Sequence, residues 1–161
     1  MKSASSKRYD IDYMERTRLY YRAMGYETDY QWAHFESVPF TVPARPVRES
    51  RLAVITTAMA SDADASQRQL AAYPSNPIPA SLLTDHLSWD KDNTHTRDVP
   101  SFLPLEQINR LVEEGFVGSP GPRFYCLPTE YSKRTTMKED APGVLELCRQ
   151  DRVDLALLVP L

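Results

Sequence analysis

The chain has 161 residues, of which 42% are hydrophobic and 25% charged, and its formal net charge at neutral pH is −3. This length allows one hydrophobic core, and the composition is ordinary for a globular protein. The charge pattern shows no basic face or arm of the kind that binds nucleic acid, and no apolar run approaches the ~20 residues that cross a membrane. Two cysteines are too few for a disulfide framework at this size, and no signal peptide is evident, so a cytoplasmic protein is expected.

Residues 1–50 are predicted to form a helical arm followed by a proline-rich linker. Apolar positions within residues 11–24 follow a helical stripe, and Gly25 supplies a stop. The arm is rich in aromatic residues: Tyr9, Tyr13, Tyr20, Tyr21, Tyr26, Tyr30 and Trp32. Rings at this density are expected to pack the arm onto the domain or onto a second subunit. Stacking on RNA would need a flanking basic groove, which the sequence lacks.

Residues 51–161 are predicted to form an α/β domain, with a small, mostly parallel sheet flanked by helices. The expected elements are strands at 51–58 and 123–127, a helix at 105–114 that Gly115 ends, and a helix capped by Thr136 and Glu139. Residues 61–79 are polar and then proline-rich, and little regular structure is expected there. Strands and helices in this order are typical of the α/β class.

The last residues, 153–161, form a short and almost wholly apolar run with β-branched residues. This pattern predicts a strand buried on both faces, as inside a parallel sheet. In open α/β sheets, the ligand binds beyond the carboxyl ends of such strands, on the loop that leads to the next helix. We therefore expect the sheet to be incomplete at the C-terminus and the working part of the site to lie beyond Leu161.

The densest cluster of ionisable groups lies in residues 85–98 and includes His86, Asp90, His95 and Asp98. Imidazole and carboxylate groups suit zinc, iron or manganese, but their spacing matches no recognised metal motif. The alternatives are a substrate-binding or proton-transfer role, since histidine titrates near neutral pH, and a solvated loop of turn residues.

Thr56 and Thr57 end the first predicted strand, where a hydroxyl could bond a substrate, although threonine also suits strands for its shape alone. Cys126 and Cys148 fall in an apolar strand and on a helix face, so both are expected to be buried and unreactive. A Gly-x-Ser-x-Gly turn and a phosphate-binding glycine loop are both lacking.

Five stretches are distinctive when they are taken in order along the chain. They are Tyr26…Tyr30-Gln31-Trp32 with Pro39-Phe40; Leu52-Ala53-Val54-Ile55-Thr56-Thr57-Ala58; His86-Leu87-Ser88-Trp89-Asp90…Asp98; Leu103-Pro104-Leu105 through Gly115-Phe116-Val117-Gly118; and Val153-Asp154-Leu155-Ala156-Leu157-Leu158-Val159-Pro160. Together they resemble the selenoprotein B family of the glycine, sarcosine and betaine reductases, which includes relatives of D-proline reductase. The resemblance covers most of the chain.

The resemblance implies reductive cleavage of a C–N bond in an amino-acid-like substrate. It also implies a pyruvoyl-bearing partner subunit that activates the amine and a dithiol that resets the redox residue. In that family, a redox-active selenocysteine or cysteine follows the closing strand, so this residue is expected beyond Leu161. The 161-residue chain is then expected to be inactive, as it would be if a UGA selenocysteine codon were read as a stop. By position, His86 and His95 are candidate proton donors, and Asp90 and Asp98 candidate amine contacts.

Two functions of other classes stay open. The chain could be a non-catalytic partner or scaffold subunit that binds through its aromatic arm, or a metal-dependent hydrolase that uses residues 85–98. In any truncated form, a strand that lacks its neighbours would leave an open sheet edge, which favours homo-oligomers or aggregates.

Overall fold

The computed structural model describes residues 12–29, 31, 34–38, 41–60, 70–84, 92–93, 95–130 and 132–161. The chain divides into two compact units, Met1–Pro39 and Phe40–Leu161, whereas the sequence suggested a division after Ser50. Backbone bonds explain why the residues just before Ser50 group with the second unit: the carbonyl of Val47 accepts from the N–H of Gly118, at 3.1 Å.

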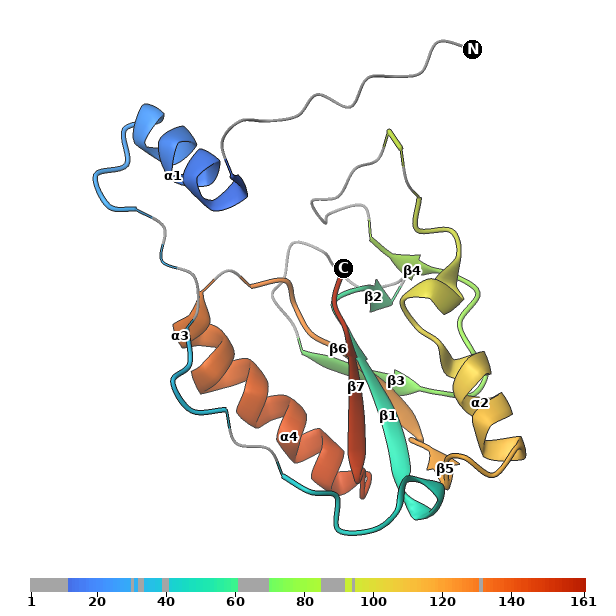
Figure 1. Ribbon diagram of the computed structural model, residues 1–161. Helices are drawn as coiled ribbons and strands as arrows, with labels where there is room; N and C mark the ends of the chain where they lie inside the picture. The colour runs from blue at the N-terminus through green and yellow to red at the C-terminus, as the bar shows by residue number, and fades with distance from the viewer. Residues whose placement is uncertain are drawn as a thin grey trace. The chain divides into compact units, whose positions relative to one another are not determined.

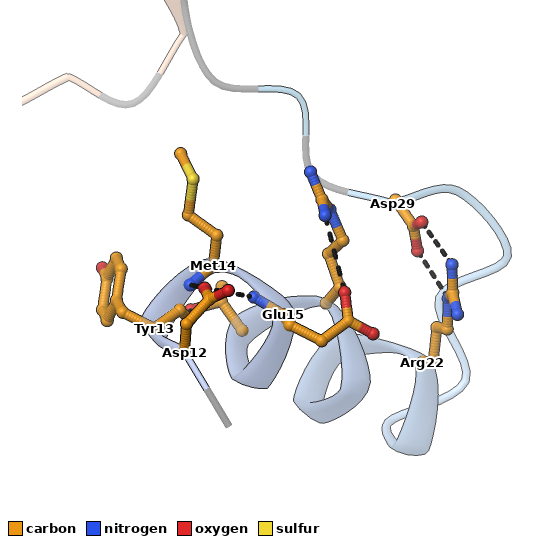
Figure 2. Close-up of polar contacts among 8 residues, drawn as sticks. Asp12, Tyr13, Met14, Glu15, Arg22 and Asp29 are labelled. Carbon is orange, nitrogen blue, oxygen red and sulfur yellow. Dashed lines mark hydrogen bonds and ion pairs between the residues drawn. The ribbon is translucent and has the colours of Figure 1, made fainter. Parts of the chain in front are cut away.

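The first unit contains one helix, α1 (Tyr13–Ala23), in its described residues (Figure 1). The carboxylate of Asp12 caps the helix by accepting from the backbone N–H groups of Met14, at 3.0 Å, and Glu15, at 3.4 Å (Figure 2). Gly25, with a φ of +89°, follows the C-cap in the left-handed region that favours glycine. The helix predicted for this segment is confirmed, and so is its glycine stop.

An ion pair and edge-to-face contacts between aromatic rings hold the segment after α1 to the helix. The guanidinium of Arg22 donates two bonds to the carboxylate of Asp29, which holds the pKa of Asp29 below its usual value (Figure 2). Tyr21 makes edge-to-face contacts with Tyr20 and Tyr26, with ring centroids 5.7 and 5.5 Å apart. An aromatic cluster near the N-terminal helix is therefore confirmed.

The second unit is built on a mixed, mostly parallel sheet, whose described part has five strands (Figure 1). The central strand, β1 (Arg51–Thr56), pairs in parallel with β7 (Leu155–Val159) over five residues of register. On its other edge, β1 pairs in parallel with β5 (Ser119–Pro120) near its start and with β6 (Arg123–Cys126) near its end. β3 (Ala71–Pro74) lies beyond β6 and is antiparallel to it. The predicted fold class is confirmed.

Helices cover both faces of this sheet (Figure 1). One face carries α2 (Leu105–Glu113), which follows the 3-10 turn η2 (Val99–Ser101). The other face carries a continuous helical segment made of α3 (Lys133–Thr135), the π-helical η3 (Thr136–Asp140) and α4 (Ala141–Gln150). Two helices on opposite faces require the sheet to be apolar on both sides.

The sequence of β1 meets this requirement. Val54 belongs to the core under α2, while Ala53 and Ile55 belong to the core under α4, and all three are buried. Because successive side chains of a strand point to opposite faces, a strand covered on both sides needs a continuous apolar run.

Helix ends were predicted with mixed success. Gly115, with a φ of +78°, follows α2 as predicted. The predicted cap at Thr136 is wrong: the helical segment starts earlier, where the hydroxyl of Ser132 accepts from the N–H of Thr135 at 3.3 Å. Thr136 itself lies inside the helical segment, so the Thr136–Glu139 spacing does not mark a helix start here.

Regular structure also occurs within residues 61–79, where the sequence suggested little, and on either side of this stretch. β3 lies in this stretch, and β2 (Met59–Ala60) pairs with β4 (Leu82–Leu83) in a small antiparallel sheet. Pro74 is tolerated at the end of β3 because β3 is an edge strand, where a missing N–H leaves no ladder bond unmade. Residues 61–69 lie outside the described ranges.

Candidate functional site

The carboxyl ends of β1 and β7 lie side by side at a topological switch point. From β1 the chain passes along the α2 face to β6, on one edge of β1 (Figure 1). It then returns along the opposite face, through α3 and α4, to β7 on the other edge of β1. Open α/β sheets bind ligands in the crevice that such a reversal creates at the carboxyl ends of the strands. The carboxyl ends of β1 and β7 are therefore the candidate functional site, and the fold alone is the basis for this choice.

The predicted substrate contacts, Thr56 and Thr57, both lie at the carboxyl end of β1 but differ in exposure. The Thr56 side chain is 1% exposed, and its hydroxyl accepts from the backbone N–H of Ala58 at 3.2 Å. Thr57 is half-buried, and its hydroxyl accepts from the N–H of Leu161 at 2.8 Å. Thr57 therefore joins the end of β1 to Leu161, two residues after β7, and a contact of either threonine with substrate stays a prediction.

Both cysteines are buried, as predicted. Cys126 is the last residue of β6, at the carboxyl end of the strand. Burial raises the pKa of its thiol to about 12, although a hydrogen bond from the backbone N–H of Ala60 partly offsets this rise. Cys148 lies on α4 under the sheet, and burial raises its pKa as well. Because the thiolate is the nucleophilic form, neither side chain is suited to redox catalysis at neutral pH.

We expect neither cysteine to react with Ellman's reagent in the folded protein, because burial disfavours both access and ionisation. In guanidinium chloride both thiols should react within minutes, which supplies the control. A thiol that reacts as fast in buffer as in denaturant would contradict the structure.

The structure describes two of the four ionisable residues predicted for the pocket. His95 and Asp98 are both exposed, and the backbone carbonyl of Asp98 accepts from the hydroxyl of Ser101 at 2.6 Å. His86 and Asp90 lie outside the described residues. Within the described ranges, no group of three or more His, Cys, Asp or Glu side chains is placed to hold a metal ion.

The segment that carries His95 is held to the small antiparallel sheet. The hydroxyls of Thr84, which directly follows β4, and Thr96 form a hydrogen bond. β2, the partner of β4, begins three residues after the end of β1. In Figure 1, this segment lies toward the same end of the sheet as the carboxyl ends of β1 and β7. The described part of the segment therefore lies toward the candidate site, and a role of His95 or Asp98 there stays a prediction.

The closing strand, β7, is parallel as predicted, but it is not buried on both faces. Leu157 is 40% exposed and Leu158 is 66% exposed. The reason is that β7 pairs only with β1 among the described strands, so its outer edge is open. A wholly apolar sequence fits a strand with neighbours on both sides, whereas the described residues supply a neighbour on one side.

A charged network lies at the opposite end of the sheet, where the parallel strands start. The sequence did not predict it. The guanidinium of Arg123, at the start of β6, donates to both carboxylate oxygens of Asp151 at 2.8 and 2.9 Å. The hydroxyl of Tyr125 donates to the same carboxylate at 2.7 Å, and these bonds hold the pKa of Asp151 below its usual value. The network ties the residue after α4 to β6. Its members are too far apart in sequence to form a local motif.

Comparison with known proteins adds no relative. No protein-family model matches the chain, and no curated protein or solved structure matches it. Among the helices of the described residues, none has the length and apolar character needed to cross a membrane. The topology, the open edge of β7 and the order of the sequence motifs are therefore the observations on which a function can be proposed.

Proposed function

We propose that this chain forms part of a selenoprotein B-like reductase, in which a segment continuing from β7 carries the redox-active selenocysteine or cysteine. The observation that supports this most is β7 itself. Its outer edge is open, Leu157 and Leu158 are exposed, and its carboxyl end lies at the switch point near Thr57.

The two exposed leucines point to what would cover β7. Leu157 is in register with Val54, whose side chain belongs to the α2 face, and Leu158 is in register with Ile55, on the α4 face. Apolar side chains on both faces of an edge strand are what a further parallel strand and its crossover helix would bury. We therefore assign the open edge to a continuation of the sheet.

Such a continuation also suits the proposed chemistry. A selenolate or thiolate that follows β7 and begins a helix would be stabilised by the positive end of that helix. As the nucleophile, it would form a bond to the substrate carbon while the C–N bond breaks, and His86 or His95 would protonate the departing amine. A dithiol would then supply two electrons and a proton that cleave the carbon–chalcogen bond, which releases the reduced product and restores the chalcogenolate as the dithiol becomes a disulfide. Asp90 and Asp98 would contact the amine, which a pyruvoyl-bearing partner subunit would activate.

The two cysteines of the chain fit this division of roles. Both are free and buried, which supports the proposal that the nucleophile lies in another segment. Free thiols are retained in a reducing compartment, and we assign the protein to the cytoplasm on this ground.

The coding DNA that follows the Leu161 codon tests the proposal at once. We expect an in-frame continuation with a selenocysteine or cysteine codon close behind Leu161, followed by a further α/β pattern. Downstream DNA with no such reading frame would refute it.

The open edge makes a second prediction, on self-association of the 161-residue chain. Leu158→Lys should weaken that association about tenfold or more, because a lysine on an edge strand opposes edge-to-edge pairing. Leu111→Lys is the matched control, since Leu111 is 39% exposed on α2, and α2 contacts β5, which pairs with the side of β1 opposite β7. Sedimentation velocity over a range of concentrations measures both. Equal effects of the two substitutions would contradict an edge-mediated contact.

One observation favours the scaffold function instead. Tyr13, Tyr20 and Tyr26 of the arm are 66%, 61% and 58% exposed, and no α1 residue is buried in the described part of the chain. Exposed tyrosines are typical of binding surfaces. Removal of residues 1–39 discriminates the reductase from the scaffold. The scaffold would be favoured if the shortened chain no longer associates with a partner subunit and if no reading frame continues beyond the Leu161 codon.

A further inference from the structure

We propose that the α/β unit carries a binding site for a phosphate group at the end of the sheet where β1 and β7 start. A pocket of about 570 Å³ opens there, and its lining includes Arg45, Arg51, Arg149 and Arg152, together with Glu49 and Asp154. The pocket lies at the start of β1 and β7, so it is separate from the candidate site at their carboxyl ends. It is also independent of the proposed reductase.

The two carboxylates of this pocket already have partners. Asp154 accepts from the backbone N–H of Arg51 at 2.9 Å and lies 3.4 Å from the guanidinium of Arg45. Glu49 forms an ion pair with its neighbour Arg48, at 3.4 Å. Neither carboxylate is therefore free to neutralise the remaining arginines.

Three of the four guanidinium groups have no carboxylate partner among the described residues. Arg51 donates to the backbone carbonyl of Asp151 at 2.7 Å, while the carboxylate of Asp151 is occupied by Arg123. The side chains of Arg149 and Arg152 make no hydrogen bond or ion pair within the part of the chain that the structure describes. Four arginines against two carboxylates leave the pocket with a net charge of +2.

The arrangement of these arginines is not explained by helix capping alone. The C-terminal end of α4 has a partial negative charge of about one half, which favours a cation such as Arg149 in the last turn. Arg45 and Arg51 come from other segments. The φ of +53° at Arg152 belongs to the end of α4 itself, because the N–H of Arg152 donates to the carbonyl of Arg149 at 3.1 Å and the N–H of Val153 to that of Cys148 at 2.8 Å, the pattern of a Schellman cap. The net charge of +2 in the pocket is therefore larger than the partial negative charge of about one half at the end of α4.

A phosphate group matches this excess in charge and in geometry. It carries up to two negative charges near neutral pH, and its oxygens accept the paired N–H donors of guanidinium groups. The pocket is too polar for an apolar ligand and is large enough for a phosphate with a small organic group attached.

Titration of the labelled protein with inorganic orthophosphate, followed by 15N–1H NMR at low ionic strength, tests the site. We expect saturable shifts of the backbone amides of residues 149–154. The double variant Arg149→Gln/Arg152→Gln should bind about tenfold more weakly or worse, because it removes two charge-assisted donors. Arg134→Gln, an exposed residue of α3 at the other end of the helical segment, removes the same kind of charge and should leave binding unchanged.

A parallel titration with glycerol 3-phosphate distinguishes two sources of the phosphate. Tighter binding than orthophosphate indicates a small phosphate monoester, and tighter binding of orthophosphate indicates the free anion; both support the site. Three results would overturn it: no saturable binding of either compound, the same shifts with sodium chloride at equal ionic strength, or equal weakening by Arg134→Gln.

Discussion

Asp151→Asn is expected to lower the free energy of unfolding of the α/β unit by about 2 kcal/mol at neutral pH, the range for hydrogen bonds to a charged group. The Asp151 side chain is 12% exposed and accepts bonds from Arg123 and Tyr125. An amide keeps the shape but leaves the Arg123 charge, 31% exposed, without its counter-ion. Urea denaturation measures the change, and Glu113→Gln, on the exposed surface of α2, is the control with little expected effect.

The same pair makes stability depend on pH in a defined direction. Because the pKa of Asp151 is lowered in the folded state, its contribution is complete above the carboxyl pKa of the unfolded chain, about 3.9. It is lost as the pH falls through the lower, folded-state pKa. The difference between the native chain and Asp151→Asn should therefore shrink on acidification below about pH 4. A difference that stays constant down to pH 2 would exclude the ionised pair as its cause.

Gly118→Ala is expected to destabilise the same unit by about 2–3 kcal/mol, as overpacking against backbone does. A Cβ at this position would lie 2.6 Å from the carbonyl carbon of Glu49 and 2.8 Å from the backbone N and O of Ser50. These atoms cannot retreat easily, because Ser50 is fully buried and its carbonyl accepts from the N–H of Ser119. The close approach is what allows β5 to enter the sheet beside β1.

Gly115 supplies the contrast for this prediction. It has a φ of +78°, and a Cβ there would have no atom within 4 Å, so Gly115→Asn adds its Cβ in open space and uses a residue that tolerates the left-handed region. We expect it to cost less than about 1 kcal/mol, measured in the same urea titrations. If Gly115→Asn proved more harmful than Gly118→Ala, the steric account of Gly118 would be wrong.

The elements with a strong local pattern were predictable from sequence. β1 and β7 are continuous apolar runs, α1 and α2 have a stripe and a glycine stop, and these features depend on neighbouring residues only. β3 and β5 were missed because both are short and end in a proline, whereas β6, which is also four residues long, was predicted from its apolar run. The open edge of β7 matches the expectation of a sheet that is incomplete at the C-terminus, but the exposure of individual residues on β7 was not predictable, because it depends on the assembled sheet.

The candidate site was predictable only in part. Thr57 was identified as a strand end, but its bond to Leu161 joins residues 104 positions apart. The arginine pocket was missed because its members come from the segment before β1, from β1 itself and from the end of α4. Neither arrangement leaves a pattern of fixed spacing in the sequence.

The most direct test of the central claim is the reductive cleavage of glycine, betaine or D-proline by the protein extended beyond Leu161. With a pyruvoyl-bearing partner subunit and dithiothreitol, we predict release of the amine or ring-opened product. Replacement of the selenocysteine or cysteine after β7 by alanine should abolish that release. Undiminished turnover by the alanine variant, or no turnover of any of the three substrates, would contradict the assignment.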